Sequence, residues 1–230
     1  MNQASSATPH RHSRLVRLLS DFAMVDDDWA YRDFADRLGQ MLSFNDSIIL
    51  SDAHKAKPER GFQRHTESAE DVKQEVLRTK ATLVNNVIQS CTSGDGKPRI
   101  RWPVVDAESA SGYEPFLRFY SAHQREQDLA IRVVRSAARD ALSACSPALK
   151  KLALLDQALD DTLWEQMRRF YGVIPRLLER RFNLLRDQQP LWLNQFRKDI
   201  QALLLAELDL RLQPVLGLVE ALEKEVIRNP

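Results

Sequence analysis

Residues 149–188 read LKKLALLDQALDDTLWEQMRRFYGVIPRLLERRFNLLRDQ. Apolar side chains recur in this stretch mostly every three or four positions, at Leu152, Leu155, Leu159, Leu163, Met167, Phe170, Ile174, Leu177, Phe182 and Leu185. Because an α-helix completes a turn in about 3.6 residues, this spacing places the apolar side chains on one face. The stretch predicts long amphipathic helices packed lengthwise, and hence an all-α protein.

The apolar pattern continues to the C-terminus, with Pro190 at the start of a last long helix. Two prolines, Pro175 and Pro214, lie inside the periodic pattern. A proline within a helix removes one backbone hydrogen bond and clashes with the preceding turn. We therefore expect a long-helix bundle with kinked C-terminal helices, the first of them kinked or broken near residues 172–175.

Upstream segments show the same helical spacing, over residues 15–22, 72–90 and 113–144. The pair Ser146-Pro147 is typical of an N-cap followed by proline at the first helical position. Residues 92–112 are rich in Gly, Pro, Asp and Ser, which predicts an irregular loop. We expect a flexible polar tail at residues 1–13 and a single helical domain of six or seven helices at residues 14–230.

Composition excludes several classes of protein. The 33 Lys and Arg residues nearly balance the 32 Asp and Glu residues, so the molecule as a whole is not an electrostatic partner for nucleic acid or an anionic membrane. Cys91 and Cys145 lack metal-ligand spacing and suit a reducing compartment. No apolar run approaches the roughly 20 residues of a membrane span, and the N-terminus lacks a signal-peptide core. These features predict a soluble cytoplasmic protein.

Catalytic and metal-binding signatures are weak. Side chains that could bind a metal ion are clustered only at His123, Glu126 and Asp128. A di-iron bundle needs paired Glu-x-x-His motifs on two helices, and this sequence has none. The sequence has no Gly-x-Ser-x-Gly elbow, and residues 94–97 lack the hydroxyl and the first glycine of a phosphate loop. We expect no enzyme activity, no metal and no cofactor. His123 is either a buried structural residue or part of a site.

Several apolar residues are candidates for contacts with a partner. Leu205 and Leu210 widen the apolar face of the last helix, which is then either enclosed within the domain or in contact with another chain. Trp102, within the irregular loop, either docks onto a partner or packs the loop onto the helices. Trp192, near the start of the last helix, completes this set of interaction candidates.

An arginine-rich stretch at residues 168–186 allows a second interpretation. Arg169, Arg176 and Arg180 can share one helix face and hold phosphates. Glu165 and Glu179 interleave with them, as in ordinary helical ion pairs, so a solvated face is the favoured interpretation. The alternative is a nucleic-acid-binding regulator that uses these arginines.

Residues 190–197 (PLWLNQFR) and 204–222 (LLAELDLRLQPVLGLVEAL), together with SPAL at 146–149, resemble an uncharacterised proteobacterial family of unknown function. The shared residues are mainly helix-packing ones, so no catalytic position is implied. The resemblance implies an association with envelope proteins of the ion-driven motor type and their outer-membrane-protein-A-like partners, and hence a soluble subunit or adaptor of such a complex.

The preferred function is therefore that of a non-enzymatic cytoplasmic interaction or adaptor protein. Helix-helix contacts with a protein partner need only apolar area and matching shape, and the sequence supplies apolar area. A homo-oligomer is compatible with the same pattern.

Overall fold

The computed structural model describes residues 13–22, 44–55, 69–92, 98–104, 112–188 and 191–228. Within these ranges the chain forms six α-helices and no strand, which confirms the predicted all-α class. The helices are α1 (Arg14–Asp21), α3 (Phe44–Lys55), α4 (Ala69–Cys91), α5 (Glu114–Cys145), α6 (Pro147–Gln188) and α7 (Trp192–Arg228). The predicted tail at residues 1–13 lies outside the described residues, apart from Ser13.

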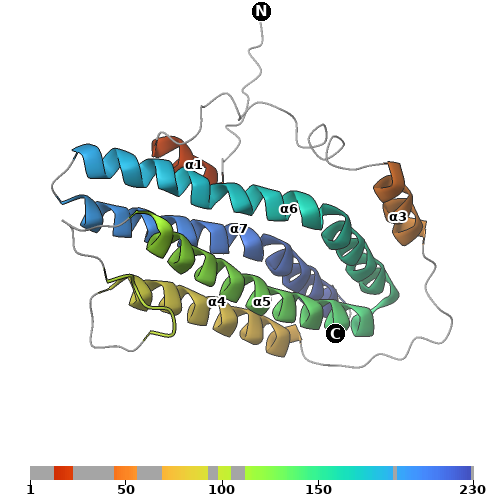
Figure 1. Cartoon of the computed structure of the whole chain (residues 1–230). Helices are drawn as coiled ribbons and strands as arrows, with labels where there is room; N and C mark the ends of the chain where they lie inside the picture. Colours follow the sequence, from red (N-terminus) through yellow and green to blue (C-terminus); the bar gives the residue numbers. More distant parts are fainter. Residues whose placement is uncertain are drawn as a thin grey trace, which may run out of the picture.

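Helices α4, α5, α6 and α7 lie lengthwise beside one another, and each runs opposite to the one before it (Figure 1). Helices α5 and α7 pack against each other, while α4 and α6 each pack against both of them. The bundle is therefore flattened, with α5 and α7 as its central pair. The short α1 contacts α7, and the short α3 contacts α6.

Side-chain caps fix where two of the helices begin. The Ser13 hydroxyl accepts a hydrogen bond from the Val16 backbone N–H at 3.2 Å, before α1. The Ser146 hydroxyl accepts one from the Leu149 N–H at 3.2 Å, and Pro147 is the first residue of α6. Such caps satisfy N–H groups that have no partner inside the helix. The predicted restart of the chain at Ser146-Pro147 is confirmed.

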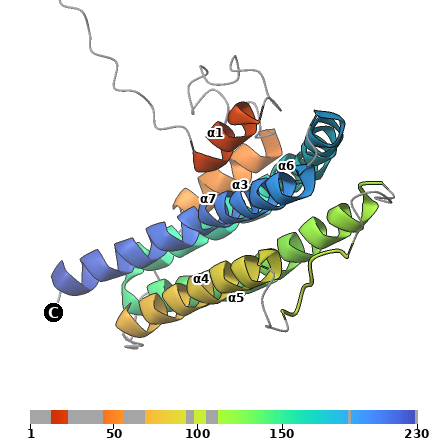
Figure 2. The same cartoon turned by 90° about the vertical axis from the view of Figure 1, so that its left-hand side faces the viewer.

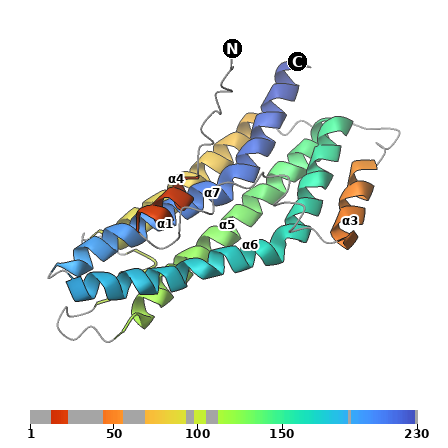
Figure 3. The ribbon, with the colours of Figure 1, turned by 90° about the horizontal axis from the view of Figure 1, so that it is seen from above.

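Neither internal proline breaks its helix. Helix α6 continues through Pro175 and α7 continues through Pro214, so of the two predicted alternatives, a kink or a break, the break does not occur. Figure 3 shows that α6 nevertheless bends along its length. Ile174, Leu177 and Leu178 are buried on both sides of Pro175, and their packing offsets the lost backbone hydrogen bond.

Helix α7 is covered from several sides. It packs against α4, α5 and α6, and α1 lies on the side of α7 away from α4 (Figure 2). Leu15 and Leu19 of α1 are buried there, and Leu205 and Leu210 pack against the same hydrophobic cluster. The wide apolar face of α7 is thus largely enclosed within the chain. None of the described helices, α7 included, is long and apolar enough to cross a bilayer.

Aromatic side chains fill the core at the end of the bundle where α7 begins. Phe116, Phe182, Trp192 and Phe196 contact one another with ring centroids 5.1 to 6.5 Å apart, mostly edge to face. Edge-to-face pairs of this kind add roughly 1 kcal/mol each beyond the area they bury. This aromatic cluster therefore fixes α5, α6 and α7 to one another.

A buried ion pair lies further along the bundle. Glu207 of α7 is completely buried, and its carboxylate accepts hydrogen bonds from Arg211 at 2.7 Å, from the Tyr120 hydroxyl at 2.9 Å and from the Gln124 amide at 3.0 Å. The Arg211 guanidinium also lies 3.6 Å from the ring centroid of Tyr171. Every oxygen of the buried carboxylate is therefore hydrogen-bonded, as a buried charge requires.

Burial and the Glu207 carboxylate raise the pKa of Tyr120 well above its usual value. The Tyr120 hydroxyl therefore stays protonated and donates to Glu207. Gln124 also donates to the Tyr171 carbonyl oxygen at 3.1 Å, so these contacts connect α5, α6 and α7 at one level. We call Glu207, Arg211, Tyr120, Gln124 and Tyr171 the buried polar cluster.

A second set of ion pairs joins α5 to α6. Arg135 and Arg139 each contact Asp156 and Asp160 at 2.6 to 2.8 Å. The side chains of both arginines and of Asp156 are less than a fifth exposed, so solvent and salt weaken these pairs less than surface pairs. The four contacts hold the start of α6 against the second half of α5.

The buried polar cluster generates a stability prediction. Glu207→Gln keeps the size of the side chain but removes the charge that balances Arg211. We expect the free energy of unfolding to fall by about 3 kcal/mol, because breaking a buried pair leaves one charge uncompensated. Urea unfolding followed by circular dichroism at about pH 7 measures the change.

The matched control is Glu220→Gln, which removes an exposed carboxylate paired with Lys224 at 2.6 Å. An exposed pair of this kind contributes little to stability, because solvent screens it, so the loss should be much smaller than in Glu207→Gln. Equal losses in the two variants would contradict the central role assigned to the buried polar cluster.

Candidate functional site

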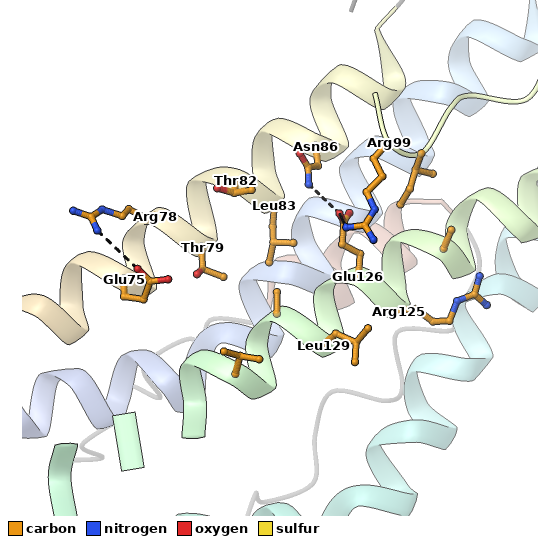
Figure 4. A pocket seen from close by; sticks show the side chains of 14 residues that line it. Glu75, Arg78, Thr79, Thr82, Leu83, Asn86, Arg99, Arg125, Glu126 and Leu129 are labelled. Atoms are coloured by element: carbon orange, nitrogen blue, oxygen red, sulfur yellow. Dashed lines mark hydrogen bonds and ion pairs between the residues drawn. The ribbon is translucent and has the colours of Figure 1, made fainter. Parts of the chain in front are cut away.

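An open groove of about 750 Å³ runs between α4 and α5 (Figure 4). The residues that line it from α4 are Glu75, Arg78, Thr79, Thr82, Leu83 and Asn86; those from α5 are Ala122, Arg125, Glu126, Leu129, Ala130 and Val133; Arg99 and Ile100 complete it. The groove therefore combines two helical walls with a mixture of apolar and charged side chains.

Two large apolar residues are exposed in the α5 wall. The exposed fraction is 66% for Leu129 and 70% for Val133, and the two lie one helical turn apart. From α4 the groove receives Thr79 and Thr82, whose short side chains do not cover them, while Leu83 is buried between the helices. The groove therefore presents an exposed apolar pair on its α5 wall.

Charged and polar groups close one end of the groove. The Asn86 amide donates to the Glu126 carboxylate at 3.1 Å, and the Arg99 guanidinium lies 3.9 Å from the same oxygen. At the other end Arg78 lies 3.9 Å from Glu75 (Figure 4). Both ion pairs are long, so the arginines are only loosely engaged within the chain.

Trp102 anchors the segment that carries Arg99. Its ring centroid lies 5.5 Å from that of Phe116 and 5.0 Å from that of Phe119, and the Arg197 guanidinium lies 4.9 Å from the Trp102 ring. Trp102 thus packs the described segment, residues 98–104, onto the helices. Of the two alternatives for this residue, the structure supports packing, and Trp102 places Arg99 at the groove.

His123 lies inside the bundle, three residues before Glu126 on α5. Its ring is edge-on to Phe119 with centroids 4.8 Å apart, and its Nδ1 is 3.9 Å from a Glu126 oxygen. Neither ring nitrogen makes a hydrogen bond to a described residue. Burial lowers the pKa of His123 from 6.5 to about 4, so the imidazole is neutral at physiological pH.

The other predicted interaction residues are not part of the groove. Trp192 is buried in the aromatic cluster, with 4% of its surface exposed, and Leu205 and Leu210 are partly buried against the core. These three side chains are therefore used within the chain. No group of three or more His, Cys, Asp or Glu side chains within the described ranges is arranged to hold a metal ion.

The three arginines of the alternative prediction lie together on α6. Arg169, Arg176 and Arg180 are all exposed, and none of them forms an ion pair with a residue in the described part of the chain. Neighbouring charges do pair, since Arg168 lies 4.0 Å from Glu165. The face that carries Arg169, Arg176 and Arg180 is therefore an exposed basic strip.

Leu129 and Val133 were missed as candidates in the sequence. They lie two positions after the buried Gln127 and Ile131, which is about 200° around the helix and so on the opposite face. Two large apolar residues one turn apart on an otherwise polar face were the available signal. This signal identifies a groove only when the residues of α4 beside Leu129 and Val133 are known. The sequence of α5 alone does not show which α4 residues these are.

The buried imidazole generates a pH prediction. The unfolded chain binds a proton at His123 below about pH 6.5, whereas the folded chain does so only near pH 4. The unfolded state therefore binds more protons between these values, and stability is lost as the pH falls through them. We expect this residue to contribute about 3 kcal/mol to the loss between about pH 7 and pH 4.

The measurement is urea unfolding of the wild type and of His123→Leu across that pH range. The variant should lose less stability on acidification, because leucine cannot be protonated. Parallel pH profiles for the two proteins would contradict the neutral, buried state assigned to His123.

Comparisons with known proteins place the chain in a family. No curated protein and no solved structure is detectably similar to it. Residues 1–224 match a family described as "Protein of unknown function (DUF3348)". The match covers nearly the whole chain and agrees with the predicted resemblance to an uncharacterised family. The chain, an all-α bundle with an open groove between α4 and α5, belongs to the DUF3348 family of proteins of unknown function.

Proposed function

We propose that this protein is a non-enzymatic interaction or adaptor protein of the cytoplasm, and that it binds a protein partner through the groove between α4 and α5. The observation that carries the proposal is the exposure of Leu129 and Val133, at 66% and 70%, within a groove walled by two helices. A helix laid between two helices buries its apolar face against both walls. The groove thus suits a partner helix.

The states of His123 and Cys91 support a role without catalysis. His123 is buried and neutral, and a 3.9 Å separation from Glu126 is too long for a hydrogen bond. Burial raises the pKa of the Cys91 thiol to about 12, so the thiolate needed for nucleophilic attack does not form. We therefore propose that the protein is not an enzyme and needs no cofactor.

The resemblance that the sequence carries gives the proposal a more specific form. It implies a partner among envelope proteins of the ion-driven motor type, with this chain as a subunit or adaptor on the cytoplasmic side. A homo-oligomer that uses the same groove is compatible with the proposal. Both forms depend on helix-helix contact, so one set of groove variants tests them together.

A second candidate function is nucleic-acid binding through α6. The observation that favours it is the exposed basic strip, because Arg169, Arg176 and Arg180 lie one or two turns apart without ion-pair partners among the described residues. Unpaired arginines in a row are available to phosphate groups. The strip lies on α6 and the groove lies between α4 and α5, so variants can separate the two functions.

The main proposal is tested by the double variant Leu129→Glu and Val133→Glu. Two carboxylates in the apolar part of the groove should reduce capture of the partner by about tenfold or more, since charges are costly to bury in an interface. Both positions are exposed, so folding should change by less than about 1 kcal/mol. Wild-type and variant proteins are used as baits in lysate of the source cells, and captured proteins are quantified by mass spectrometry.

The matched control is the double variant Leu191→Glu and Ile227→Glu, whose side chains are 75% and 80% exposed outside the groove. It should capture the same proteins as the wild type. Proteins retained equally by all three baits would contradict the proposal, as would a wild-type chain that is monomeric in solution and captures no partner.

The second candidate predicts binding to DNA or RNA that weakens steeply with salt. Removing two phosphate contacts with Arg176→Ala and Arg180→Ala should lower the salt slope by about two, with folding intact. Fluorescence anisotropy with labelled duplex DNA and single-stranded RNA at several salt concentrations measures both quantities. Absence of binding by the wild type at low salt would exclude this function.

A further inference from the structure

We infer that the occupant of the α4–α5 groove is an acidic amphipathic helix of a partner protein, with apolar residues on Leu129 and Val133 and carboxylates at both ends of the contact. The inference rests on the proposed function and adds the chemistry of the partner. It is carried by the placement of three arginines around the apolar pair: Arg78 at one end of the groove, and Arg99 and Arg125 at the other (Figure 4).

The cations of the groove project into solvent more than the carboxylates do. The side chains of Arg78 and Arg99 are 75% and 86% exposed, and Arg125 is also exposed. The Glu126 side chain is only 16% exposed, and its carboxylate accepts a hydrogen bond from Asn86. The Glu75 side chain, which lies beside Arg78, is 58% exposed. The excess of exposed positive charge is therefore largest at the end that carries Arg99 and Arg125. With three arginines against two glutamates, the groove as a whole favours a negatively charged partner.

The two ion pairs inside the groove do not satisfy these arginines. Each joins an arginine to a glutamate at 3.9 Å, which is beyond hydrogen-bonding distance. A guanidinium group binds a carboxylate best through two short parallel hydrogen bonds. Carboxylates on a partner can therefore form better contacts than those that Glu75 and Glu126 provide.

The dimensions of the groove set the length of the contact. Arg78 and Asn86 are separated by about 12 Å along α4, and Arg125 and Val133 by a similar length along α5, at ~1.5 Å of rise per residue. This length corresponds to about two helical turns, with room for two or three apolar residues at i, i+4 and i+7. Acidic residues one turn beyond each end would then reach the arginines.

The apolar pair distinguishes a helix from other anionic partners. A nucleic acid would place a continuous row of phosphates along its binding site, whereas the α5 wall of this groove carries the apolar Leu129 and Val133 next to its charges. A small anion would use one end and leave the exposed apolar pair uncovered. An amphipathic helix that carries acidic residues beside an apolar stripe satisfies both features.

The test uses two synthetic peptides of about 18 residues with the same leucine stripe, flanked by glutamates in one and by lysines in the other. Binding to the full chain is measured by fluorescence anisotropy. The glutamate peptide should bind at least about tenfold more tightly than the lysine peptide, and its binding should weaken with added salt. The double variant Leu129→Glu and Val133→Glu should bind neither peptide.

Two triple variants then locate the charges. Arg78→Gln, Arg99→Gln and Arg125→Gln together should weaken binding of the glutamate peptide by about tenfold or more. The control removes three other exposed arginines, through Arg169→Gln, Arg176→Gln and Arg180→Gln, and should leave binding within about twofold. Equal losses in the two triple variants would show a nonspecific charge effect and would overturn the inference.

Other outcomes also decide the question. Equal binding of the two peptides, or no binding of the glutamate peptide up to about 1 mM, overturns the acidic partner. A homodimer that dissociates in the Leu129→Glu and Val133→Glu variant means that a second copy of this chain occupies the groove, which also overturns it. If captured cellular partners depend on Leu129 and Val133 but not on the three groove arginines, this inference fails while the proposed function stands.

Discussion

Helix α7 carries more apolar surface than one neighbouring helix can cover, and the arrangement of the other helices follows from that constraint. Its buried residues face α5 and α6 as well as α4, and α1 adds Leu15 and Leu19 to the hydrophobic cluster beside α7. Covering a wide apolar helix on several sides makes it the centre of the bundle. The outer face of α4 and α5 receives no such cover among the described helices, and the groove lies there.

The buried polar cluster fixes the position of α7 along its neighbours α5 and α6. Glu207 lies in the sequence between Leu204 and Leu208, which are both buried, so leucine packing alone would tolerate a shift of α7 along α5. A charged carboxylate cannot tolerate that shift, because it would lose the Tyr120 and Gln124 donors and remain buried. We interpret the cluster as the element that sets how α5, α6 and α7 align. The groove depends on it indirectly, since α5 supplies Leu129 and Val133.

The helical periodicity of the sequence predicts the fold class well. It predicts the contacts between helices only in part. The class and the capped start at Ser146 follow from local chemistry, which neighbouring helices do not alter. The continuity of α6 through Pro175 did not follow, because burial of the adjacent Leu177 and Leu178 is a tertiary effect. The enclosure of Leu205 and Leu210 was left open for the same reason. The groove was missed because it depends on Thr79 and Thr82 of one helix lying beside the exposed leucine of another.

The basic strip and the groove show why charge alone does not identify a partner. Each displays three exposed arginines, and each has apolar neighbours, since Val173 and Leu184 are 45% and 40% exposed on α6. The strip lies on one helix, so a ligand there can contact it from one side only. In the groove, a helix can contact α4 and α5 together and bury both of its flanks. Because buried contact area and charge then act on the same ligand, the groove is the stronger candidate for a specific protein partner.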